Sequence, residues 1–155
     1  MKAGQDRMCA GSVSTISPDE PVIRRIPKSP GFYDSHKTPP ILRGAFTPNQ
    51  RDTDGLSFFL ERELPIEALL ANSRHTAEEC LIVRLKASDI YDLGMTLART
   101  NKTGDLPGHV VVPELNIRDY EKKQLKQRLK ECGKRLADLA WKNVVILPNQ
   151  ISDDV

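Results

Sequence analysis

The chain has 155 residues, of which 39% are hydrophobic and 28% charged, and its formal net charge is +2. This length favours one domain, and this composition excludes a fully disordered or collagen-like chain. No apolar run reaches the roughly 18 residues that a membrane-spanning helix needs. The composition therefore predicts a soluble protein, and the near balance of charge gives no first indication of a nucleic-acid partner.

The amino-terminal residues and the cysteines predict a cytoplasmic location. The first twenty residues, MKAGQDRMCAGSVSTISPDE, lack the continuous apolar region of a secretory signal. The three cysteines, Cys9, Cys80 and Cys132, are odd in number and contain no C-x-x-C pair. Reduced thiols are therefore expected in place of a disulfide framework.

Proline divides the chain into regions. Seven of the eleven prolines fall within the first fifty residues, and because proline fixes φ and lacks an N–H, that region is not expected to hold a long helix or a central strand. We predict a flexible arm over residues 1–20 and a flexible tail over 149–155. Between them, residues 21–148 form a single α+β domain with a proline-rich loop at 27–54.

Short runs of apolar and β-branched residues predict a sheet of five or six strands. The runs are 21–26, 55–60, 80–86, 95–99, 109–112 and 144–147. CLIVRLK, at 80–86, is the most apolar run, which favours a central strand. The turn-rich sequence NKTGDLPG predicts a hairpin between the fourth and fifth runs.

Two short helices, at 65–71 and 88–93, and one long helix, at 117–141, are predicted between the strands. Asn116 is a good residue to begin the long helix. Its apolar residues are spaced by 4, 3, 4 and 3 positions, so they form one stripe: Leu125, Leu129, Cys132, Leu136 and Leu139. The fold class is therefore α+β, with a small mixed, mostly antiparallel sheet covered by one long carboxy-terminal amphipathic helix and two short helices.

The charge is concentrated in the long helix. Residues 118–142 contain nine basic and four acidic residues, a net charge of +5, so the rest of the chain carries −3. The lysines are Lys122, Lys123, Lys126, Lys130, Lys134 and Lys142. A solvated face whose lysine stems cover apolar surface is the commoner arrangement, and a face that binds phosphates, an acidic partner or an anionic membrane surface is the alternative. Aromatic residues are only 5% of the chain, which argues against recognition by base stacking.

Known catalytic and nucleotide-binding motifs are absent from the sequence. The histidines His36, His75 and His109 share no ligand-like spacing with one another or with Cys80, so neither a metal site nor a cofactor is predicted.

His109 is the most interesting histidine, because Gly108 precedes it at the start of a predicted strand. Glycine permits close backbone approach, and a general base requires a fixed imidazole with a pKa near the operating pH. Ser57, in the second strand, and Ser35, beside His36, are candidate hydroxyl partners. A strand-edge histidine that hydrogen-bonds to the backbone is the alternative.

The order of Arg24 or Arg25, Ser57 and Glu114 resembles ADP-ribosyltransferases of the Arg–Ser–Glu type. The resemblance implies that the arginine holds a phosphate of a nicotinamide dinucleotide and that the serine orients the ribose. It implies that the glutamate stabilises the oxocarbenium-like centre.

A second resemblance covers more of the chain. The succession VIRRI, GAF, DGLSFFL, LGMTL and PGHVVVPEL is similar to small uncharacterised bacterial proteins of this length. That resemblance carries no activity. It implies that one group of residues gathers in one place: Phe46, Asp54, Gly55, Ser57, Pro107, Gly108 and His109.

Three function hypotheses follow from the sequence. The first is a non-enzymatic accessory module of a bacterial multi-protein system, which docks a protein partner through the proline-rich loop and the basic helix. The second is a small enzyme acting on a nucleotide or nucleic acid through His109, Ser57 and Arg24 or Arg25, with Glu114 as a further candidate. The third is nucleic-acid binding without sequence readout by the basic helix.

Overall fold

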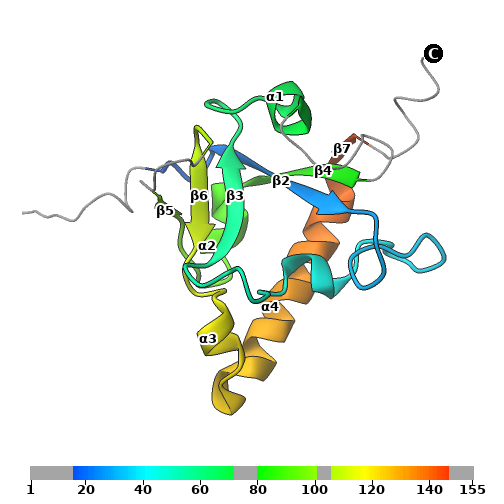
Figure 1. Ribbon diagram of the computed structural model, residues 1–155, viewed down its shortest axis with the longest axis vertical. Helices are drawn as coiled ribbons and strands as arrows, with labels where there is room; N and C mark the ends of the chain where they lie inside the picture. The colour runs from blue at the N-terminus through cyan, green and yellow to red at the C-terminus, as the bar shows by residue number, and fades with distance from the viewer. Residues whose placement is uncertain (1–15, 72–79, 101–105, 147–155) are drawn as a thin grey trace, which may run out of the picture.

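One antiparallel sheet organises the protein. The computed structural model describes residues 16–71, 80–100 and 106–146 (Figure 1). The strands are β2 (Pro21–Pro27), β3 (Leu56–Leu60), β4 (Cys80–Lys86), β5 (Ala98–Arg99), β6 (His109–Val112) and β7 (Val144–Ile146). Their order in the sheet is β5-β6-β3-β2-β4-β7, and every pair of neighbours is antiparallel. The α+β class and the six strands are confirmed, with an antiparallel sheet in place of the mixed one.

The apolar strand β4 lies between β2 and β7, so it is an inner strand next to the edge. Its ladder with β2 runs from Pro21 opposite Lys86 to Pro27 opposite Cys80. The hairpin expected around NKTGDLPG is present, because β5 pairs with β6. Residues 101–105 of that turn lie outside the described residues.

The long helix α4 (Lys123–Lys142) packs across one face of the sheet (Figure 1). The predicted stripe forms its inner side: Leu129, Cys132 and Leu136 are buried, and Leu125 and Leu139 are partly buried against the same core. The helix does not break at the glycine in its middle. No helix in the described ranges is long and apolar enough to cross a membrane.

The helix expected over 117–141 is two helices, which corrects the prediction. The first, α3 (Ile117–Tyr120), is one turn long and begins after Asn116, whose Oδ1 accepts a hydrogen bond from the Asp119 N–H at 2.9 Å. Lys122 then takes an extended backbone conformation, with φ −76° and ψ 126°, before α4 begins. Periodicity alone does not reveal such a break, because the apolar spacing of α4 starts only at Leu125.

Two short helices lie at either side of the sheet. α1 (Ile66–Ala71) packs its Leu69 on the face opposite α4, against Ile23 and Ile82. α2 (Ala87–Tyr91) continues directly from β4 and contributes to the core beneath α4. These are the helices predicted at 65–71 and 88–93, with boundaries moved by one or two residues.

The proline-rich loop at 27–54 is folded back on itself. The N–H of Leu42 donates to the carbonyl of Phe32 at 2.9 Å, and the 3-10 helix η2 (Arg43–Phe46) follows. Phe46 is fully buried in the main core. The loop is therefore fastened to the domain by its own apolar residues.

The described residues that precede β2 also contact the core. Ile16 is buried, and its carbonyl accepts a hydrogen bond from the Tyr91 hydroxyl at 2.8 Å. Residues 1–15 of the predicted arm and the whole tail at 149–155 lie outside the described residues.

The side chain of Asn116 also binds the carboxylate of Asp119 at the start of α3. Its Nδ2 donates to Oδ2 of Asp119 at 2.9 Å, and this hydrogen bond is the largest cause that holds the pKa of Asp119 below its usual value. A carboxylate whose pKa is lowered by folding stabilises the fold above its unfolded pKa, and that contribution is lost as the pH falls.

We expect Asn116→Ala to lower the free energy of unfolding by about 1 kcal/mol, because a helix cap is removed, and to raise the pKa of Asp119. Urea unfolding and an NMR titration of Asp119 measure the two effects. Gln127→Ala, on the exposed side of α4, is the control. If the pKa of Asp119 does not change in Asn116→Ala, the Asn116 side chain is not the cause of its lowered value.

Candidate functional site

Ser57 and His109 lie on the sheet face opposite α4. In the ladder between β3 and β6, Phe59 pairs with His109 and Ser57 pairs with Val111. Leu56 and Phe58 point into the core beneath α4. Since alternate residues of a strand face opposite sides, the side chains of Ser57 and His109 share the other face.

The structure brings Ser57 and His109 into direct contact. The His109 Nε2 lies 2.9 Å from the Ser57 Oγ, and the His109 Nδ1 lies 2.6 Å from the Thr100 Oγ1. The imidazole therefore links two hydroxyl groups. When Nδ1 carries the proton, Nε2 is the acceptor that faces the Ser57 hydroxyl; in the other tautomer Nε2–H donates to Ser57.

The backbone around Gly108 fixes the position of the imidazole. Gly108 has φ +75°, and a Cβ on it would lie 3.0 Å from Glu63 Cβ and 3.1 Å from the Leu60 carbonyl oxygen. The Leu60 N–H donates to the Gly108 carbonyl at 2.9 Å. The ring of Phe59 lies 5.3 Å from the His109 ring. The close approach expected of this glycine is therefore present, and it holds His109 beside β3.

No motif in the sequence points to Thr100. It follows β5, and its N–H donates to the His109 carbonyl at 3.3 Å. The ladder pairs Ala98 with Val111, so two residues further along the hairpin Thr100 stands opposite His109. The sequence predicted the hairpin, but turn residues alone do not determine which residues of its two strands stand opposite each other. The pairing of Thr100 with His109 therefore could not be predicted.

Arg24 binds main-chain carbonyls between two strands and the loop. Its guanidinium donates to the carbonyl oxygens of Ser57 at 2.7 Å and Ala45 at 3.1 Å. It also lies 5.7 Å from the ring centroids of Phe46 and Phe58. Burial lowers the pKa of Arg24 to about 10, and the negative charge of nearby Asp52 opposes this shift. Arg24 is thus a cation at neutral pH that joins β2 to β3 and η2.

Arg25 points to the other face. Ile23 faces the side opposite α4, and because alternate residues of a strand share a face, Arg25 lies on that same side of β2. Arg25 is half-buried. With the other described residues it forms no ion pair.

Glu114 is bonded to Thr96. Its Oε1 accepts a hydrogen bond from the Thr96 N–H at 3.0 Å, and its Oε2 accepts one from the Thr96 hydroxyl at 2.8 Å. Arg24, Ser57 and Glu114 therefore form no hydrogen bonds between their side chains. The ADP-ribosyltransferase-like arrangement stays a prediction, and the contacts present here join Ser57 to His109.

The residues that the second resemblance groups together lie on both faces. Phe46 stacks on Phe58 in the main core, with 6.2 Å between ring centroids. Gly55 has φ +135°, and a Cβ there would collide with the Val112 carbonyl, so it allows β3 to lie against the end of β6. Gly108, His109 and Ser57 meet on the opposite face.

The lysines of the basic helix are spread along its length. Lys122 pairs with Asp119 at 3.2 Å, and the Lys126 Nζ lies 5.7 Å from the centre of the Tyr120 ring. Lys123, Lys126 and Lys134 are exposed and Lys130 is half-buried. Trp141, near the carboxy-terminal end of α4, is exposed to 37%.

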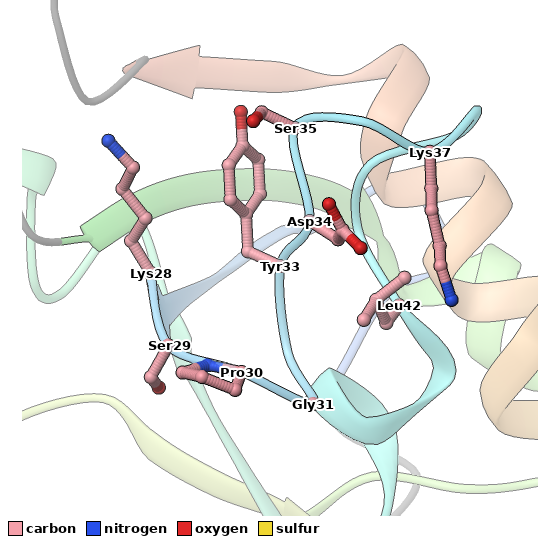
Figure 2. A pocket seen from close by; sticks show the side chains of 9 residues that line it. All are labelled: Lys28, Ser29, Pro30, Gly31, Tyr33, Asp34, Ser35, Lys37 and Leu42. Carbon is pink, nitrogen blue, oxygen red and sulfur yellow. The ribbon is translucent and has the colours of Figure 1, made fainter.

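A pocket of about 580 Å³ lies within the proline-rich loop (Figure 2). Figure 2 shows Lys28 and Lys37 at opposite sides of it, with Tyr33 and Asp34 between them. The composition of the loop predicted irregular structure but no hollow, because the pocket depends on how the loop folds back.

Among the described residues, no group of three histidine, cysteine, aspartate or glutamate side chains could hold a metal ion. His36 is exposed in the loop, and His75 lies outside the described residues. Cys80 and Cys132 are buried thiols outside any disulfide. Burial raises the pKa of the Cys132 thiol, which lowers its reactivity at neutral pH.

No family model, curated protein or solved structure matches the chain. Its function is therefore inferred from the described side chains and their contacts.

The contacts of Arg24 predict a large effect of its replacement. We expect Arg24→Met to lower the free energy of unfolding by about 2 kcal/mol, because the carbonyls of Ala45 and Ser57 lose a charged donor. Arg25→Met is the matched control and should change it by less than about 0.5 kcal/mol. Urea unfolding followed by circular dichroism measures both. Equal losses in the two variants would contradict the structural role of Arg24.

Proposed function

We propose that the protein is a non-enzymatic docking module of a cytoplasmic bacterial multi-protein system. The partner is an acidic protein segment, and the surface that binds it combines α4 with the proline-rich loop at 27–54. We call this surface the basic face. It consists of that loop together with Lys123, Lys126, Lys130, Lys134 and Trp141.

The observation that carries this proposal is the contact between the loop and the helix. Gly133 of α4 lies under η2, where a Cβ would be 3.3 Å from the Phe46 carbonyl oxygen and 3.4 Å from Arg43 Cγ. The absence of a side chain at Gly133 lets η2 rest directly on the helix. The loop and the helix are thereby neighbouring parts of one surface.

Four lysines of α4 lie on one side of the helix, and its Glu131–Arg135 ion pair lies on another. Lys123, Lys126, Lys130 and Lys134 are separated by 3, 4 and 4 positions, so they line one side of the helix. Glu131 pairs with Arg135 at 3.5 Å, on a different side of the helix. The lysine side therefore carries positive charge that its own helix does not neutralise.

Trp141 favours a protein partner over a nucleic acid. It lies seven positions, or two helical turns, beyond Lys134, so it extends the lysine side of α4. A tryptophan beside cations suits an acidic segment that also carries an apolar side chain. Single-stranded nucleic-acid sites instead present several aromatic rings along a positively charged groove.

Reversing two charges tests the basic face. We expect Lys126→Glu with Lys130→Glu to weaken binding of the partner at least about tenfold, because attraction becomes repulsion. The control pair, Arg128→Glu with Arg135→Glu, changes the net charge equally on the other side of α4. Affinity purification from the native host identifies the partner, and titration calorimetry then measures both variants.

Equal weakening by the two pairs would contradict the assignment of the surface. Filter binding to duplex DNA at low salt tests the nucleic-acid alternative. DNA retention that falls steeply with salt and is lost in the lysine pair would replace the protein partner with a polyanion bound through its backbone charge.

A further inference from the structure

Ser57, His109 and Thr100 form a continuous row on the sheet face opposite α4. We propose that this row is a hydrolytic site, in which Ser57 is the nucleophile that attacks carboxylic esters and His109 is the general base. The site is separate from the basic face, so it does not depend on the docking function.

The distances match what nucleophilic catalysis requires. A serine needs a base within about 2.6–3.2 Å, and that base needs a third group that orients it. The Ser57 Oγ lies 2.9 Å from the His109 Nε2, and the Thr100 Oγ1 lies 2.6 Å from Nδ1. Thr100 is therefore the positioning residue.

The tautomer with the proton on Nδ1 is the competent one. In it, Nδ1–H donates to the Thr100 hydroxyl oxygen and Nε2 accepts from the Ser57 hydroxyl. Thr100 is itself neutral, so it orients the imidazole through a hydrogen bond and adds no charge of its own.

The chemical steps balance with ester and water alone. The Ser57 Oγ bonds to the ester carbonyl carbon while its proton moves to the His109 Nε2, and the carbonyl electron pair moves to oxygen. The tetrahedral intermediate collapses, the bond to the alkoxy group breaks, and Nε2 returns the proton to the leaving alcohol. Water then attacks the acyl-serine by the same route, which releases the carboxylic acid and restores Ser57.

Arg25 supplies the charge that the developing oxyanion needs. Arg25 pairs with Ile82 in the ladder of β2 with β4 and so lies on the sheet face that also carries the Ser57 side chain, and it has no ion pair among the described residues. A positive group near the carbonyl oxygen stabilises the transition state more than the ground state. Arg24 cannot serve here, because its guanidinium is bonded to the Ala45 and Ser57 carbonyls.

The site is built on rigid elements. Ser57 and His109 lie on paired strands, and the hydrogen bond from the Leu60 N–H to the Gly108 carbonyl, 2.9 Å long, holds the start of β6 against the end of β3. The Phe59 ring, 5.3 Å from the imidazole, limits its rotation. Rigid strands keep the His109 Nε2 and the Ser57 Oγ at hydrogen-bonding distance during the reaction.

A fluorophosphonate probe on the full chain tests the proposal directly. We expect covalent modification of Ser57, located by mass spectrometry, with loss of fluoride. Ser57→Ala should abolish the labelling, and the control Ser17→Ala, at an exposed serine before β2, should leave it unchanged. A folded wild-type chain whose Ser57 is not labelled would overturn the proposal.

Hydrolysis of p-nitrophenyl acetate separates the roles of the three partners. We expect His109→Gln to lower the rate above the Ser57→Ala background by about 100-fold, the usual contribution of a general base. Thr100→Val keeps the shape of Thr100 and should both slow hydrolysis and move the midpoint of its pH profile, which a purely structural role would not do. Circular dichroism verifies that each variant is folded. Rates that are equal in wild type and Ser57→Ala would overturn the assignment.

Discussion

The guanidinium of Arg24 is the contact on which both proposed surfaces depend. β2 and β3 pair only at Val22 and Ile23, and beyond that point Arg24 joins them through the Ser57 carbonyl. Its second hydrogen bond holds the Ala45 carbonyl of η2. Burying a cation is costly, and here two carbonyl acceptors and two aromatic rings offset that cost.

The sheet separates the two proposed functions in space. The helix α4, which covers one face of the sheet (Figure 1), carries the lysines of the basic face, and Ser57, His109 and Thr100 lie on the opposite face. A partner docked on α4 would therefore not contact these hydroxyl groups. This arrangement lets each proposal be tested by variants that do not touch the other.

The sequence predicted the parts of this fold that depend on periodicity and turn chemistry. The alternation in β3 and the stripe of α4 each reflect burial on one side, and the continuous apolar run of β4 reflects burial on both faces. The break at Lys122 and the seat of η2 on Gly133 were not predictable, because they depend on contacts between segments far apart in the chain. The position of Thr100 was partly predictable. The hairpin was predicted, and Thr100 stands opposite His109 once the register of that hairpin is known.

The pleat of β2 decides which arginine can take part in chemistry. The tandem Arg24 and Arg25 are equivalent in the sequence, but successive residues of a strand face opposite sides. Arg24 therefore enters the core side and is bonded to main-chain carbonyls, whereas Arg25 shares the face of the Ser57 hydroxyl. The arginine on the Ser57 side of β2 is therefore Arg25, and the side chain that contacts the Ser57 hydroxyl is that of His109, whereas Glu114 is bonded to Thr96.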